Sequence, residues 1–223
     1  MAPIQCIGFI LDGNRRWAKE RGEPTLLGHK AGFDKLEECV RWVQRRGIKH
    51  IAAFVFSTEN WKRTQEEVEY LMDLFREMAE SKFEELSKEG AAVRFIGKLD
   101  MLPEDLRRSI RTMEAKNIAD PKITIWICIS YGSRAEIVAA ANDAAKAGEI
   151  TEESLRLHMW SAQMPDPDII VRTSGEQRLS NFLLWQAAYA ELFFIQPHWP
   201  DFSEQLLDEI LEEYASRQRR HGK

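Results

Sequence analysis

The chain has 223 residues, of which 44% are apolar, so it can bury the core of one large domain. Its 36 acidic residues outnumber the 31 basic ones, and the net charge of −5 argues against general nucleic-acid binding. The three cysteines, Cys6, Cys39 and Cys128, are widely spaced in sequence, which indicates neither a metal knuckle nor a disulfide framework and suits a reducing cytoplasm. No segment approaches the roughly 20 apolar residues of a membrane-spanning helix.

Short apolar runs alternate along the chain with longer segments of helical spacing. The short runs predict strands at 4–11, 48–56, 91–96, 122–130, 167–172 and 191–195. The longer segments predict helices at 29–46, 65–89, 103–117, 134–147, 151–160 and 203–219. This alternation predicts an α/β fold with a central six-stranded, mostly parallel sheet flanked by helices. We find no repeat or linker, so residues 1–223 are expected to form a single domain.

Local signals mark the ends of several predicted helices. Gly47 and Gly90 fall where the predicted helices should end, and Pro103 is expected to occupy the first helical position of segment 103–117. The stretch from Thr64 to Glu67 has the capping-box pattern that starts a helix. These signals fix the order of helices and strands before any chemistry is considered.

Polar loops follow four of the predicted strands. Because ligands of open α/β sheets bind at the carboxyl ends of strands, these loops are expected to meet at one rim. The arginines that they bring there are Arg15, Arg16, Arg63, Arg134, Arg172 and Arg178. Guanidinium groups bind phosphate oxygens in pairs, and glycine-containing turns before helices offer free backbone N–H groups. The rim therefore predicts a site for more than one phosphate.

Asp12 is a single acid among these cations. A carboxylate would repel a phosphate, but it can hold a magnesium ion that bridges phosphate oxygens. The alternative is a plain turn or helix cap, for which Asp-Gly-Asn is a common sequence. That alternative does not explain four polar clusters at one rim. The chain has no Walker loop and no Gly-x-Ser-x-Gly elbow, which argues against a nucleotide kinase or a serine hydrolase.

The motifs resemble those of the cis-prenyltransferases, typified by undecaprenyl diphosphate synthase. The resemblance is carried, in order, by FILDGNRRWAKERG (9–22), GHKAG (28–32), FSTENWKR (56–63), SYGSRAEI (130–137), PDIIVRTSGEQRLSNFLLWQAAYAELFF (167–194), WPDF (199–202) and RHG (220–222). It implies a homodimer whose subunits each enclose an apolar tunnel. It also implies Mg²⁺-dependent condensation of isopentenyl diphosphate with an allylic diphosphate such as farnesyl or geranyl diphosphate, with loss of pyrophosphate.

The resemblance also implies roles for individual residues. Asp12 would bind Mg²⁺ and assist departure of the allylic diphosphate, Glu191 would complete the metal site from the neighbouring subunit, and Asn60 is a candidate for proton removal. The residues implied to bind the allylic diphosphate are Gly13, Asn14, Arg15, Arg16, Trp17, His29, Trp61 and Arg63. Those implied to bind isopentenyl diphosphate are Arg172, Arg178, Ser180, Arg220 and Gly222. Val55, Ile123 and Ile129 would line the tunnel.

Several positions depart from the common family pattern. Thr25 stands where an arginine is usual, while Arg15 stands where glycine is frequent, so one phosphate-binding cation has moved in our interpretation. The other departures are Ser130, Ser133, Gln177 and Thr64. Val55 and Ile129 occupy positions that are commonly alanine, and their added bulk predicts a short or medium product.

Two other functions stay open. In the first, the enzyme couples allylic diphosphates irregularly. In the second, the protein is a non-catalytic partner subunit, which the retention of Asp12 and Glu191 disfavours. We expect a cytoplasmic protein, and release of an apolar product favours peripheral contact with the inner face of the membrane.

Overall fold

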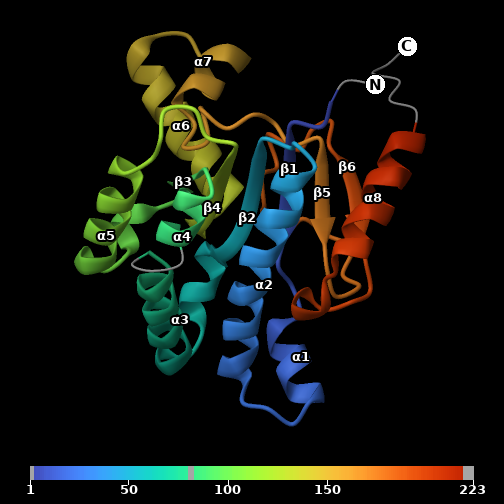
Figure 1. The fold of residues 1–223 in the computed structure, drawn as a ribbon. Helices are drawn as coiled ribbons and strands as arrows, with labels where there is room; N and C mark the ends of the chain where they lie inside the picture. The colour runs from blue at the N-terminus through green and yellow to red at the C-terminus, as the bar shows by residue number, and fades with distance from the viewer. Residues whose placement is uncertain (1–2, 80–82, 218–223) are drawn as a thin grey trace.

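The computed structural model describes residues 3–79 and 83–217, and its centre is a six-stranded sheet in the order β3-β4-β2-β1-β5-β6 (Figure 1). The strands are β1 (Cys6–Ile10), β2 (His50–Ser57), β3 (Ala91–Ile96), β4 (Ile123–Tyr131), β5 (Ile169–Arg172) and β6 (Glu191–Phe194). Every neighbouring pair runs parallel. The prediction of a mostly parallel six-stranded sheet is confirmed, and the sheet is parallel throughout.

Helices cover both faces of this sheet. They are α1 (Asn14–Glu20), α2 (Thr25–Arg45), α3 (Gln65–Glu77), α4 (Phe83–Lys88), α5 (Glu104–Ala115), α6 (Ser133–Ala147), α7 (Glu152–His158) and α8 (Glu204–Ser216). Two 3₁₀ turns matter for the site: η1 (Thr58–Lys62) and η4 (Trp199–Asp201). In the part of the chain described, none of the helices is long and apolar enough to span a bilayer.

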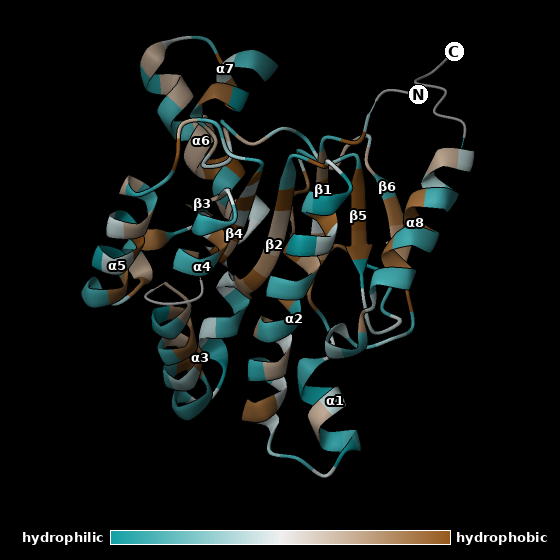
Figure 2. Cartoon of the chain, in the orientation of Figure 1, coloured by the Kyte–Doolittle hydropathy of each residue, from teal (hydrophilic) through white to brown (hydrophobic). Residues whose placement is uncertain are grey.

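Successive strand residues pack into different cores, because side chains of a strand alternate between the two faces of a sheet. Ile7, Phe9 and Ile51 pack in a cluster with side chains of α2, α3, α5 and α8. Ile10 and Ala52 pack on the other face with Phe182 and its neighbours from the 179–190 segment. Burial on both faces explains why these strands are nearly continuous apolar runs (Figure 2).

The structure differs from the sequence-based prediction at three helices. The segment 65–89 contains two helices, α3 and α4, rather than one. The short helix α1 was not predicted, and α2 begins at Thr25 instead of residue 29. The capping-box prediction is only half confirmed: Thr64 Oγ1 accepts a bond from the Glu67 amide at 3.4 Å, but the Glu67 carboxylate turns to other partners.

Pro103 was expected at the first helical position but is the N-cap of α5, whereas the glycine signals and the cysteines behave as the sequence indicates. Gly47 (φ 73°) and Gly90 (φ 96°) follow helix ends in the left-handed region that glycine tolerates. The three cysteines are free and buried, and burial raises the pKa of each thiol. They are therefore protonated core residues.

Candidate functional site

A cavity of about 880 Å³ lies at the carboxyl ends of β1 and β2, at the lower end of the sheet in Figure 1. Ten residues that the sequence singles out line it: Asp12, Gly13, Asn14, Arg15, Arg16, His29, Asn60, Arg63, Arg172 and Ser180. An apolar wall completes it, made of Ile10, Leu11, Phe54, Val55, Phe56 and Leu71. The loops after β1, β2 and β5 thus converge as the strand-end rule predicts, beside a surface that suits a hydrocarbon, whereas Arg134 and Arg178 do not line the cavity.

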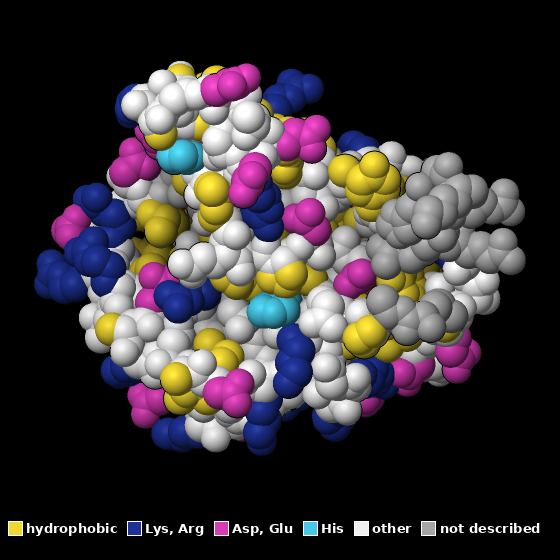
Figure 3. Space-filling view, turned by 90° about the horizontal axis from the view of Figure 1, so that it is seen from above, with side chains coloured by type: hydrophobic (Ala, Val, Ile, Leu, Met, Phe, Trp, Pro, Cys, Tyr) yellow, Lys and Arg dark blue, Asp and Glu magenta, His cyan; other side chains and the backbone are white. Residues whose placement is uncertain are grey.

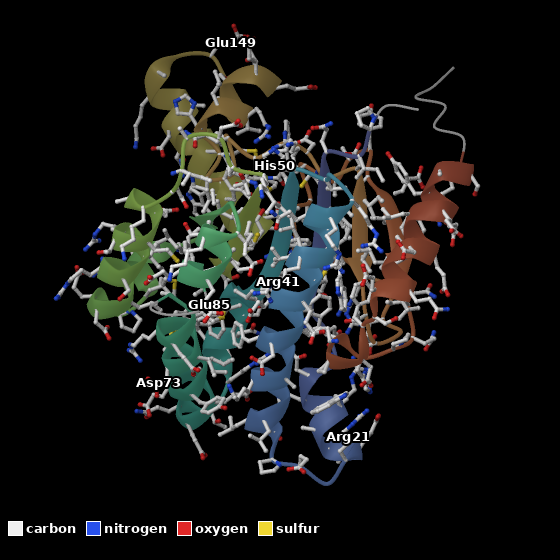
Figure 4. The ribbon with its side chains drawn as sticks, in the orientation of Figure 1. Arg21, Arg41, His50, Asp73, Glu85 and Glu149 are labelled. Carbon is white, nitrogen blue, oxygen red and sulfur yellow. The ribbon has the colours of Figure 1, made fainter. Side chains whose placement is uncertain are left out.

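The opposite end of the sheet looks different. Figure 3 views that face, on which acidic and basic side chains are intermixed and basic ones gather at the edge over α5. His50, at the amino end of β2, marks the same end of the sheet in Figure 4. The arginines that surround the cavity lie at the carboxyl end of the sheet.

Asp12 lies between two of the predicted arginines. Its carboxylate accepts a 2.7 Å hydrogen bond from Arg172 Nη2, and Arg16 Nη2 lies 3.2 Å from the other oxygen. Burial raises the pKa of Asp12, but the bond and charge of Arg172, with those of Arg16, outweigh burial and lower the pKa below its usual value. Asp12 is therefore an ionised carboxylate at the cavity at neutral pH.

The backbone of Asp12 is fixed from outside its own strand. Its carbonyl oxygen accepts bonds from Thr173 Oγ1 at 2.6 Å and from the Trp199 amide at 3.0 Å. The next residue, Gly13, has φ 104° and precedes α1. A side chain is strained there, so the sequence requires glycine to turn the chain from β1 into α1.

Arg172 connects Asp12 to the segment that follows β5. Only 4% of Arg172 is exposed, and its Nη1 donates to the Arg178 carbonyl (2.5 Å) and to Ser180 Oγ (2.7 Å). Its buried Nε has no hydrogen-bond partner among the described residues. A buried guanidinium with a spare donor beside a cavity favours an anionic ligand. The side chain of Arg178 instead pairs with Glu176, which also lies 3.3 Å from Arg16.

Glu67 was not predicted as a site residue, yet it holds three predicted ones. Its Oε1 lies 3.0 Å from His29 Nε2 and 2.9 Å from Arg63 Nη1, and its Oε2 lies 3.7 Å from Arg15 Nη1. Burial lowers the pKa of His29; the Glu67 bond opposes this, and Arg63 and Arg15 add to the lowering. The local signal for Glu67 is that it lies four residues after Arg63, which comes just before α3.

The two glycines of the GHKAG motif allow α1 and α2 to pack closely. A Cβ on Gly28 would lie 2.0 Å from the Asn14 carbonyl oxygen, and one on Gly32 would lie 2.6 Å from the Asn14 side chain. Asn14 Oδ1 is buried and has no hydrogen-bond partner among the described residues. The two glycines thereby bring α2, with His29, against the start of α1.

Asn60 and Trp61 lie in η1, and their side chains make hydrogen bonds within the protein. Asn60 Oδ1 accepts from the Ser57 amide at 2.9 Å, and Trp61 Nε1 donates to Ser130 Oγ at 2.9 Å. The bond to Ser130 gives one departure from the family pattern a defined partner. Trp17, by contrast, donates from Nε1 to Asp201 Oδ1 at 2.7 Å, which ties α1 to η4.

The remaining predicted residues are those of the tunnel, Glu191, and two residues near the C-terminus. Val55 reaches the cavity wall, whereas Ile123 and Ile129 are fully buried in the core. Glu191 begins β6 in register with Ile169, at the strand end away from Asp12, and pairs with Arg217 at 2.8 Å. Arg220 and Gly222 lie outside the described residues.

A second, smaller cavity of about 30 Å³ lies between α2, α3, α4 and β4, and none of the three residues predicted for the tunnel lines it. Its apolar lining includes Phe33, Leu36, Leu74, Phe83 and Ile125. That volume is about the share of a single water molecule in the liquid. A hydrocarbon chain would enter this space only if those side chains moved apart.

Comparison with known proteins agrees with these features. A family model described as "Putative undecaprenyl diphosphate synthase" matches residues 10–222. An isoprenyl transferase of Thermotoga maritima is 45% identical, over 98% of this chain and 96% of the relative. One from Agrobacterium fabrum is 43% identical, over 97% of this chain and 91% of the relative.

Two solved structures show the same fold. Lavandulyl diphosphate synthase from Lavandula x intermedia, in complex with dimethylallyl diphosphate, superposes with a TM-score of 0.94 at 32% identity, covering 99% of this chain and 98% of that one. A probable undecaprenyl diphosphate synthase from Campylobacter jejuni gives 0.86 at 29% identity, covering 100% of both chains.

Proposed function

Because the chain belongs to the undecaprenyl diphosphate synthase family of prenyltransferases, and is thus a transferase, we propose that it elongates an allylic diphosphate with isopentenyl diphosphate in the cis configuration. Pyrophosphate leaves C1 of the allylic substrate while the double bond of isopentenyl diphosphate attacks that carbon. Loss of one proton then leaves a new Z double bond.

The observation that carries the proposal is the position of Asp12. It is an ionised carboxylate between Arg172 and Arg16, at a cavity with an apolar wall. Cations and amides aimed at a departing pyrophosphate stabilise the charge that gathers on it as the C–O bond breaks. The apolar wall excludes water, which would otherwise capture a carbocation-like intermediate.

The chain's own groups divide between the two substrates. Arg15, Arg16 and the backbone at the start of α1 would bind the allylic diphosphate, with His29 and Arg63 beside them. Arg172, Ser180 and Arg178 would bind isopentenyl diphosphate. Asn60 stays our candidate for the group that accepts the proton, although its Oδ1 is bonded to the Ser57 amide here and would have to be released.

The donor set suits Mg²⁺ only in part within one chain. Asp12 supplies a single carboxylate, which fits an ion that takes its other ligands from diphosphate oxygens and water. The described residues contain no cluster of three or more His, Cys, Asp or Glu side chains able to hold a metal. When bound, Mg²⁺ would neutralise the leaving diphosphate. Glu191 lies at the other end of the sheet, so its proposed role requires the neighbouring subunit of a homodimer.

Arg15 and Thr25 both line the cavity, which supports the interpretation that a phosphate-binding cation has moved from one position to the other. We propose a short- to medium-chain product from farnesyl or geranyl diphosphate. Val55 lines the cavity and adds bulk there relative to alanine, which supports a limit on chain length.

Irregular coupling of two allylic diphosphates is the second candidate. This activity is favoured by the superposition on lavandulyl diphosphate synthase in complex with dimethylallyl diphosphate, which has a TM-score of 0.94. Incubation with dimethylallyl diphosphate alone distinguishes the two: a coupled product supports irregular coupling, and no product from protein that elongates farnesyl diphosphate rules it out.

Purified protein, farnesyl diphosphate, labelled isopentenyl diphosphate and Mg²⁺ test the main proposal. We expect labelled Z-polyprenyl diphosphates, release of pyrophosphate, and loss of both when Mg²⁺ is chelated. Products of undecaprenyl length would refute the chain-length proposal, and an absence of labelled product would refute elongation by this protein alone.

A further inference from the structure

Glu20, His198 and Ser174 form a hydrogen-bond chain behind the cavity. Ser174 Oγ lies 2.6 Å from His198 Nδ1, and His198 Nε2 lies 3.0 Å from Glu20 Oε1. A carboxylate only accepts hydrogen bonds, so Nε2 carries the proton that is donated to Glu20, and in the tautomer protonated at Nε2 alone, Nδ1 accepts from the Ser174 hydroxyl. The chain of bonds therefore has one consistent direction from Ser174 to Glu20.

The three residues come from three separate segments. Glu20 ends α1, Ser174 follows β5, and His198 immediately precedes η4. Arg21, labelled at the lower end of α1 in Figure 4, adds a 3.1 Å contact to Asp201 in η4. Helix α1 and the segment after β5 are thus joined through a side chain that does not itself line the cavity.

The backbone of Gly13 passes directly beside this chain of bonds. A Cβ on Gly13 would lie 2.6 Å from His198 Nδ1 and 2.7 Å from Ser174 Oγ. Gly13 itself lines the cavity. His198 and Ser174 therefore support the cavity wall at the turn that carries Asp12.

Ser174 is held in an unusual backbone conformation. Its φ is 78°, in the left-handed region that non-glycine residues rarely adopt, and such a conformation persists only when the surroundings enforce it. Its amide donates to the Pro197 carbonyl at 2.8 Å while its side chain meets His198. The segment before η4 thus binds both the backbone and the side chain of Ser174, which lies two residues after Arg172.

We infer that His198 is a positioning residue for the proposed reaction, holding the segment after β5 against the Asp12–Gly13 turn through its bond to Ser174. The inference rests on the proposed function for its kinetic consequence. The inner bond is expected to matter more than the outer one, because Ser174 is only 7% exposed whereas the Glu20 side chain is 62% exposed.

Two substitutions of His198 separate the inner bond from the outer one. His198→Asn keeps an amide near the place of Nδ1, beside Ser174, but cannot reach Glu20. His198→Gln extends toward Glu20 and loses the inner bond. We expect kcat/KM to fall at least tenfold in His198→Ala and His198→Gln, mainly through KM for both diphosphates, and to fall less than threefold in His198→Asn.

Ser174→Ala removes the same inner bond from the other side and should reproduce the kinetic loss of His198→Ala. His158→Ala is the matched control, since His158 Nδ1 makes one 2.7 Å bond, to the Ser154 carbonyl, within α7. It should leave both kinetic constants unchanged. Equal losses in all three His198 variants, or unchanged kinetics in His198→Ala, would overturn the inference.

Amide hydrogen exchange tests the inference independently of activity. His198→Ala should speed exchange at least threefold in peptides covering 10–16 and 173–178, and His158→Ala should not. Unchanged exchange in both peptides would also overturn it. An inactive wild-type protein would count against the proposed function, while this exchange measurement would still decide the role of His198.

Discussion

Replacing Glu67 by glutamine tests how the cavity holds its cations. The Glu67 side chain is only 10% exposed and meets His29, Arg63 and Arg15. A hydrogen bond to a charged group contributes about 1.5–3 kcal/mol, and removing one partner of a buried ion pair costs about 3–5 kcal/mol. Since glutamine keeps one acceptor oxygen and Arg15 is exposed, we expect the free energy of unfolding to fall by about 2–3 kcal/mol, which lowers Tm by roughly 4–12 °C.

Glu67→Gln should have the opposite effect on anion binding. The Glu67 charge competes with a diphosphate for Arg15 and Arg63, so its loss frees both. A change of about 1 kcal/mol, the interaction energy of two unit charges about 4 Å apart in water, makes pyrophosphate bind about fivefold more tightly. The added ligand should therefore restore part of the lost Tm.

Thermal unfolding with and without inorganic pyrophosphate measures both effects. The matched control is Glu38→Gln on α2, because Glu38 is 51% exposed and pairs with Lys35 at 2.6 Å. Such a surface pair contributes about 0–1 kcal/mol. Unchanged stability in Glu67→Gln, or weaker pyrophosphate binding, would refute the reasoning.

Three other predictions concern single side chains around the cavity. Gly13→Ala should lower the free energy of unfolding by about 2–4 kcal/mol, because a left-handed φ costs about 1–3 kcal/mol and the new Cβ also meets His198 and Ser174; denaturant unfolding checks this, and a loss below 1 kcal/mol would contradict it. The pKa of His29 is lowered in the folded state, so its stabilisation is complete above the unfolded pKa of about 6.5 and is lost as pH falls from there toward the folded value. His29→Gln should therefore flatten the decline in Tm between pH 7 and pH 5, and an equally steep decline would count against a neutral His29. Val55→Ala enlarges the cavity and should shift the product distribution to longer chains, which chromatography of the labelled products measures. An unchanged distribution would show that Val55 does not determine product length.

The strands could be predicted from sequence because burial on both faces makes them apolar runs. The run 91–96 matches β3 residue for residue, and the other five agree with the structure within about two residues at each end. The helix α1 was missed because its seven residues, NRRWAKE, carry almost no apolar periodicity. Its position comes from tertiary packing on Gly28 and Gly32, which a local pattern does not contain.

The same distinction holds within the site. The strand-end rule places Asp12, Arg16, Arg63 and Arg172 correctly at one cavity because parallel strands finish at one edge. Glu67 and His198 were missed because their partners are distant in sequence. His29 and Glu67 are 38 residues apart, and Ser174 and His198 are 24 apart. Only the fold brings those side chains together.

Transfer of labelled isopentenyl diphosphate by wild-type and Asp12→Ala protein tests the central claim, that Asp12 at this cavity carries the prenyl-transfer reaction. Circular dichroism verifies that the variant is folded, and Asp143→Ala, at an exposed carboxylate paired with Lys146, is the control. We predict label in Z-polyprenyl diphosphate with the wild type and the control, and at least a thousandfold slower transfer with folded Asp12→Ala, since a metal ligand and leaving-group contact contributes about 4 kcal/mol or more to the transition state. Transfer by Asp12→Ala at the wild-type rate would contradict the account.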